Sequence, residues 1–94
     1  MWLKTDGTLL NLNLMSYIQK RYYFANSYDA KYGYDKNHQK PVIDIYKVNL
    51  ADPFETLYFS KEEERNDFFS MIVEKLQSEP NGIIEYDYLK YNNE

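Results

Sequence analysis

Few side chains of this 94-residue chain could carry out chemistry. The sequence has no cysteine, which excludes thiol catalysis, thiolate metal sites and disulfides, and its one histidine is His38. A serine–histidine–aspartate arrangement would need His38, which stands beside Asn37 and Gln39 in a stretch rich in turn-forming residues. The sequence also has no glycine-flanked serine elbow. We therefore expect no catalytic residues, and a protein that is not an enzyme.

The same stretch, residues 26–40, holds the best candidates for metal ligands. His38 with Asp29, Asp35 and Asn37 would supply atoms for a hard cation, but the spacing and the bidentate glutamate of an EF-hand are missing. Asp and Asn in such a stretch are typical of turns. The three glycines are too far apart to build a phosphate-binding loop. We expect no metal and no cofactor.

Tyrosine is the most unusual feature of the composition, with eleven tyrosines against one tryptophan. A tyrosine ring can be buried while its hydroxyl contacts water or a partner, and tyrosine is enriched at interfaces. We therefore interpret the chain as a non-catalytic protein-interaction module that self-associates, as a homodimer, the commonest oligomer. The candidate interaction surface comprises Arg21, Tyr23, Tyr28, Tyr32, Tyr34, His38, Tyr86 and Tyr88.

Two alternatives involve nucleic acids. Residues 17–40 interleave tyrosines with lysine and arginine, a pattern that could stack on and neutralise a single strand. Alternatively, the protein could be an acidic inhibitor that imitates nucleic acid. Residues 1–61 contain eight Lys or Arg and six Asp or Glu, whereas residues 62–94 contain three and nine. The overall charge of −4 argues against strong nonspecific binding to DNA or anionic membranes.

One segment, residues 60–78, reads as an amphipathic helix. Ser60 and Glu63 have the spacing of a capping box, and glutamates fill the first turn, where the helix dipole favours anions. An apolar stripe follows at spacings of three and four, made of Phe68, Phe69, Ile72, Val73 and Leu76. Arg65 is assigned to the polar side. The glutamate cluster is explained by the dipole, so we interpret this helix as scaffold.

Short strands precede the helix. Asp6-Gly7 predicts a tight hairpin between residues 2–5 and 8–11. Alternation predicts a long strand over 15–25, with Ile18 and Tyr22 on the core side, and further strands over 41–50 and 55–59. Residues 83–91 are assigned to a last strand, with a short helix as the alternative.

The element order predicts an α+β fold. We expect an antiparallel β-meander of about five strands, one helix (60–78) packed on one face, and a short C-terminal strand or tail. Residues 1–91 form a single domain and residues 92–94 fray.

Residues 2–12 and the glutamate-rich run into Phe68-Phe69 resemble parts of small uncharacterised bacterial and phage-borne proteins. Those proteins look like a short antiparallel sheet closed by one C-terminal helix, distantly similar to pleckstrin-homology sheets. The resemblance implies this fold and brings no activity, cofactor or site residue with it.

The cell compartment is predicted from what the sequence lacks. Absence of cysteine fits a reducing compartment, and no apolar run approaches the roughly 20 residues that span a bilayer. The first four residues are too polar to open a signal peptide. We expect a cytoplasmic protein without a membrane partner.

Overall fold

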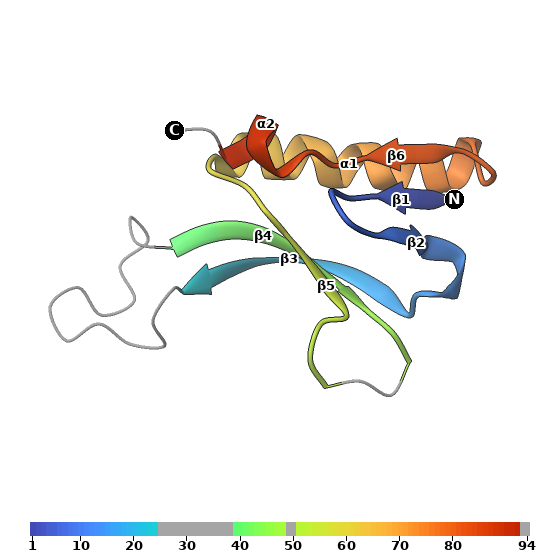
Figure 1. The fold of residues 1–94 in the computed structure, drawn as a ribbon, viewed down its shortest axis with the longest axis horizontal. Helices are drawn as coiled ribbons and strands as arrows, with labels where there is room; N and C mark the ends of the chain where they lie inside the picture. Colours follow the sequence, from blue (N-terminus) through green and yellow to red (C-terminus); the bar gives the residue numbers. More distant parts are fainter. Residues whose placement is uncertain (25–38, 49–50, 93–94) are drawn as a thin grey trace, which may run out of the picture.

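The computed structural model describes residues 1–24, 39–48 and 51–92, and it confirms the α+β class (Figure 1). The strands are β1 (Trp2–Lys4), β2 (Leu9–Asn11), β3 (Tyr17–Phe24), β4 (Gln39–Tyr46), β5 (Glu55–Tyr58) and β6 (Ile83–Glu85). The helices are a short 3-10 helix, η1 (Leu12–Leu14), the main helix α1 (Glu62–Ser78) and α2 (Tyr88–Asn92). None of the helices in these residues is long and apolar enough to cross a membrane.

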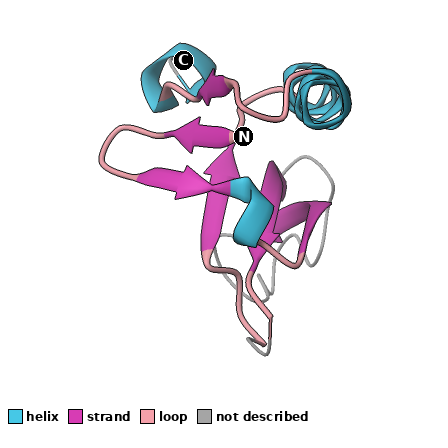
Figure 2. Cartoon of the chain, turned by 90° about the vertical axis from the view of Figure 1, so that its right-hand side faces the viewer, coloured by secondary structure: helices cyan, strands magenta, loops and turns pink. Residues whose placement is uncertain are grey.

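The strands form two three-stranded sheets. In the first, here the small sheet, β1 lies between β2 and β6, antiparallel to β2 and parallel to β6 (Figure 2). The predicted hairpin is confirmed, since the Thr5 amide donates to the Thr8 carbonyl (2.8 Å) around Asp6-Gly7. In the second, here the main sheet, β4 lies between β3 and β5, and both pairings are antiparallel.

This arrangement differs from the single five-stranded meander that the sequence predicted. After β2, the Asn11 side chain accepts from the Asn13 amide (3.0 Å) and the chain turns through η1 instead of entering the next strand. The second edge of β1 is then taken by β6, which follows α1 in sequence. Parallel pairing needs a long crossover connection, and the intervening chain, with its helix, provides one.

Helix α1 confirms the predicted helix but not its start. The helix begins at Glu62, with Lys61 as the N-cap and no side-chain capping bond, so the capping box at Ser60 is wrong. Ser60 is instead held by the C-terminal segment, because its amide donates to the Tyr91 carbonyl (2.9 Å). Glu62, the first residue of the helix, accepts a hydrogen bond from the Tyr22 hydroxyl.

The apolar stripe of α1 is narrower than predicted. Phe68 and Ile72 are buried, Phe69 and Leu76 are partly buried against the core, and Val73 is 37% exposed. The core joins the inner faces of both sheets to α1. Its buried members are Met1, Leu3, Leu10, Leu12, Ile43, Ile45, Leu57, Phe59, Phe68, Ile72, Ile84 and Tyr86.

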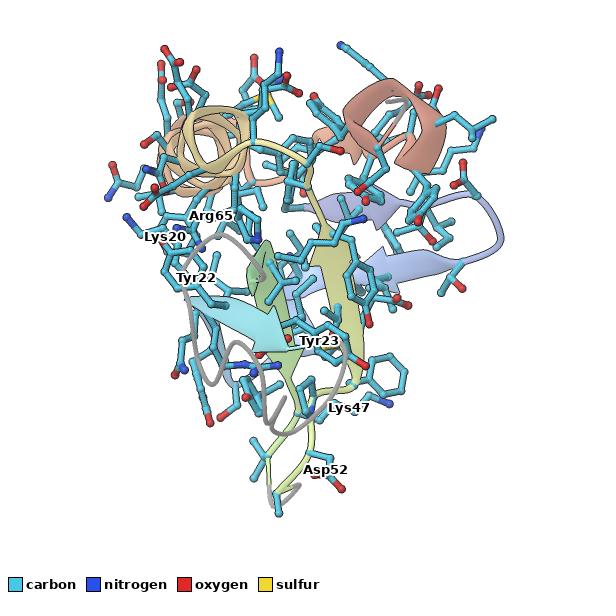
Figure 3. All side chains as sticks on the ribbon, turned by 90° about the vertical axis from the view of Figure 1, so that its left-hand side faces the viewer. Lys20, Tyr22, Tyr23, Lys47, Asp52 and Arg65 are labelled. Carbon is cyan, nitrogen blue, oxygen red and sulfur yellow. The ribbon has the colours of Figure 1, made fainter. Side chains whose placement is uncertain are left out.

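The prediction that Arg65 lies on the polar side of α1 is wrong, because its side chain is only 4% exposed. Its Nη1 donates to the backbone carbonyls of Arg21 (2.8 Å) and Val42 (3.3 Å), on neighbouring strands of the main sheet. The guanidinium carbon lies 5.0 Å from the centre of the Tyr22 ring (Figure 3). A buried guanidinium is stable when its donors are satisfied, so Arg65 fastens α1 to the sheet.

The C-terminal segment contains both of the elements that the sequence left open, a three-residue strand and then a short helix. Between them, the Tyr86 hydroxyl donates to the Tyr58 carbonyl and accepts from the Tyr58 amide (3.1 Å). The Asn92 side-chain amide also donates to the Tyr58 carbonyl (2.7 Å). These bonds occupy backbone groups of β5 and blunt that edge of the main sheet.

Candidate interaction surface on the main sheet

The two faces of the main sheet carry different side chains. Residues in register point to the same side of a sheet and successive residues to opposite sides. Helix α1 packs on the side that carries Ile43, Ile45 and Leu57. Figure 3 shows Lys20 and Tyr22 on this side of β3, whereas Tyr23 points away from it. The opposite side is here called the tyrosine face, and it comprises Tyr17, Gln19, Arg21, Tyr23, Lys40, Val42, Asp44, Tyr46, Thr56 and Tyr58.

Two pairs of rings lie at the two ends of the tyrosine face. Tyr17 and Tyr46 are stacked, with ring centres 4.4 Å apart and planes 14° from parallel. Tyr23 meets Tyr58 edge to face, with ring centres 5.6 Å apart. Tyr17 is 51% and Tyr23 is 37% exposed. Each accessible ring therefore rests on a partner ring, which restricts its rotamers before any ligand arrives.

The middle of the tyrosine face is a hydrogen-bonded polar row. Arg21 Nε forms an ion pair with Asp44, and Thr56 Oγ1 donates to the other oxygen of that carboxylate (2.8 Å). Asp44 is fully buried, whereas the Arg21 side chain is 38% exposed. The hydrogen bond that Arg21 donates to Asp44 raises the pKa of the Arg21 guanidinium. Asp44 thus holds Arg21 in place while part of its guanidinium stays accessible.

Lys40 links the tyrosine face to α2. Its Nζ lies 5.9 Å from the centre of the Tyr58 ring and 5.8 Å from that of Tyr88, which is 41% exposed. A cation at this distance is attracted to the ring faces. Among the described side chains of the tyrosine face, the accessible charges are those of Arg21 and Lys40. Both are positive, because Asp44 is buried in its ion pair.

The hydroxyls of Tyr46, Tyr58 and Tyr86 stay protonated at neutral pH. Burial raises the pKa of Tyr46 and of Tyr58 above the ordinary value of 10. Burial also raises the pKa of Tyr86 to about 12. These groups act as neutral hydrogen-bond donors and acceptors rather than as bases.

The structure brings together three of the residues that the sequence predicted for the interaction surface. The Tyr23 ring contacts the Tyr58 ring, and Lys40 lies over the ring of Tyr88. Arg21 is two residues before Tyr23 on the same face of β3, in register with Val42. The prediction that Tyr86 belongs to the interaction surface is wrong, because Tyr86 is 6% exposed and belongs to the core. The remaining predicted residues, Tyr28, Tyr32, Tyr34 and His38, lie outside the described residues.

The sequence prediction omitted Tyr17, Lys40, Tyr46 and Tyr58 from this surface. A signal for Tyr46 was available, since alternation in β4 places it opposite Ile43 and Ile45. The same signal was available for Tyr58, since alternation places it opposite Leu57 and Phe59, which are buried. Lys40 reaches Tyr88 through the docking of α2, which local sequence patterns do not encode.

The described residues contain no group of three or more His, Asp or Glu side chains that could hold a metal ion. Comparison of the chain with protein-family models, curated proteins and solved structures finds no match. The function is therefore inferred from the geometry of the surface.

Proposed function

We propose that this chain is a non-catalytic protein-binding module, and that its tyrosine face binds an acidic segment of a partner protein. The observation that carries this proposal is that rigid, solvent-accessible tyrosine rings share one face of the main sheet with accessible positive charges. Tyr17 and Tyr23 are each backed by another ring, and the accessible charges are those of Arg21 and Lys40.

The residue types favour a protein partner. Tyrosine and arginine are enriched among the residues that dominate binding energy in protein interfaces, and side chains that are already ordered lose less entropy on binding. Arg21 is ordered by Asp44, and it can offer its remaining N–H groups to a carboxylate of the partner. Apolar side chains of the same segment would cover the rings. The net charge of −4 makes a long polyanion a less favourable ligand than a short acidic segment.

The test is a selection of random displayed peptides on the full chain. We expect enrichment of peptides that combine Asp or Glu with aromatic residues, and micromolar affinities. Lys40→Glu and Tyr23→Ala should each weaken the selected peptides by at least about tenfold, the effect of roughly 1.4 kcal/mol. Lys61→Glu is the matched charge reversal outside the face and should bind like the wild type. Equal binding by wild type and Lys40→Glu would refute the proposal.

A second candidate, binding of single-stranded nucleic acid, is favoured by the same rings and cations, because bases stack on tyrosine and phosphates pair with arginine and lysine. Fluorescence anisotropy of short labelled oligonucleotides at low salt distinguishes the two. Binding that weakens steeply with salt and is lost in Lys40→Glu would favour nucleic acid. Absence of such binding would remove this candidate.

A further inference from the structure

The small sheet has one buried face and one exposed apolar face. Leu3, Leu10 and Ile84 point into the core and are at most 3% exposed. The alternate residues point outward, and three of them are large and apolar. Trp2 is 39%, Leu9 57% and Ile83 59% exposed.

The outward side chains form an ordered grid, which follows from the strand register. Trp2 lies beside Ile83 across the β1–β6 pair, and Lys4 lies beside Glu85 one step along the same strands. On the other side of β1, Leu9 is the neighbour of Lys4. Trp2 and Ile83 therefore share a row with Asn11, and the neighbouring row holds Leu9 with one positive and one negative charge.

We propose that a second copy of this chain binds the outer face of the small sheet, around a two-fold axis parallel to the strands and midway between β1 and β6. Rotation about this axis exchanges the positions of the two strands. Lys4 then faces the partner's Glu85, and Glu85 faces the partner's Lys4. Trp2 faces the partner's Ile83, and Ile83 faces the partner's Trp2, so that two such apolar contacts form across the interface.

The charges argue for a second copy over a partner of another kind. Lys4 and Glu85 occupy positions that the axis interchanges, so one pair of opposite charges becomes two pairs across the interface. An isologous interface requires this self-complementarity. A partner with charges of one sign would be attracted by one of these residues and repelled by the other. The tyrosine face lacks this property, since its accessible charges are all positive.

Dimerisation through the small sheet goes beyond the proposed function and does not depend on it. The tyrosine face belongs to the other sheet, and none of its residues is part of this interface. A dimer would present two tyrosine faces at once, which raises the apparent affinity for a partner with repeated acidic segments. A variant of the small sheet should therefore lose dimerisation and still bind the peptide, and a variant of the tyrosine face should lose peptide binding and still dimerise.

The first experiment measures the mass of the full chain by sedimentation velocity over a range of concentrations. A three-stranded face is small for an interface, so we expect a dimer with a dissociation constant of about 10 μM. Ile83→Lys should give a monomer. Its unfolding curve, measured at a concentration below the dissociation constant, should match that of the wild type because Ile83 is largely exposed. Leu89→Lys is the matched control, since Leu89 is 71% exposed outside this face, and it should remain dimeric.

A charge exchange tests the axis itself. Lys4→Glu and Glu85→Lys should each raise the dissociation constant at least about tenfold, because like charges then meet across the interface. The double variant restores opposite charges and should return the dissociation constant to within about threefold of the wild type. A double variant as weak as the single ones would overturn the proposed axis.

Trp2 provides an internal probe, because it is the single tryptophan of the chain. Its emission should shift to shorter wavelength, and its quenching by acrylamide should fall, over the concentration range in which the mass doubles. The proposal is overturned if the chain stays monomeric up to about 1 mM. A dimer that persists in Ile83→Lys, or whose formation leaves Trp2 emission unchanged, would also overturn it.

Discussion

Replacing Tyr86 with phenylalanine tests how the C-terminal segment closes the edge of the main sheet. The substitution keeps the ring in the core and removes one hydroxyl. That hydroxyl donates to the Tyr58 carbonyl, accepts from the Tyr58 amide, and accepts from the Asn92 side chain (3.2 Å). The carbonyl keeps Asn92 as a partner, whereas the amide loses the partner that the hydroxyl provides.

The expected loss follows from these bonds. A net hydrogen bond contributes about 1 kcal/mol, and a buried donor left without a partner costs about 1–3 kcal/mol. We expect Tyr86→Phe to lower the free energy of unfolding by about 2 kcal/mol in urea denaturation, with an unchanged m-value. Tyr88→Phe, the same change at an exposed ring, should cost less than about 0.5 kcal/mol. A Tyr86→Phe variant as stable as the wild type would refute the role of the hydroxyl.

The same hydroxyl predicts a pH dependence. The pKa of Tyr86 in the folded chain is about 12, above the ordinary value of 10, so the folded state retains a proton that the unfolded state releases. The resulting stability is fully present below pH 10 and is lost as the pH rises toward 12, by about 3 kcal/mol at most. Burial of Tyr46 and Tyr58 acts in the same direction. Tyr86→Phe should remove most of this alkaline decline.

Three further predictions concern stability, each measured by urea or thermal unfolding. Arg65→Met should lower the free energy of unfolding by about 3 kcal/mol, because the hydrogen bonds from α1 to two strand carbonyls are lost. Lys75→Met on the same helix should cost less than about 0.5 kcal/mol. Equal costs would contradict the role of Arg65 in holding α1 on the sheet. Phe68→Ala should cost about 3–5 kcal/mol and Phe69→Ala about half as much, since only the first ring is fully buried; the reverse order would contradict the packing. Deletion of residues 83–94 removes β6, the Tyr86 hydroxyl and α2, and should abolish cooperative unfolding; a deletion variant that melts like the full chain would contradict the internal role of this segment.

Local signals in the sequence were sufficient for the hairpin and the main helix. Asp6-Gly7 determines a turn by its own backbone preferences, and the spacing of Phe68 and Ile72 reflects burial on one face. The division into two sheets was not predictable in this way. It depends on which strand takes the second edge of β1, and the partner, β6, lies about 80 residues away in sequence.

The errors within elements have the same origin in long-range contacts. Arginine is typical of solvent-facing helix positions. The burial of Arg65 depends on backbone carbonyls of the main sheet that only the fold places beside α1. Tyr86 was predicted at an interface because its hydrogen bonds to the backbone of Tyr58 cannot be inferred from the local sequence. Arg21 and Tyr23 were predictable because strict alternation places them on one face of β3, whereas the contact between Lys40 and Tyr88 depends on where α2 docks.

The most direct test of the tyrosine face as a binding surface is an NMR titration of the isotope-labelled full chain with a selected acidic peptide. We expect the largest shifts in the backbone amides of β3, β4 and β5, centred on Arg21, Lys40 and Tyr58. The Lys40→Glu variant should need at least about tenfold more peptide to reach the same shifts. Shifts confined to α1 or to the small sheet, with the main sheet unperturbed, would contradict the proposal.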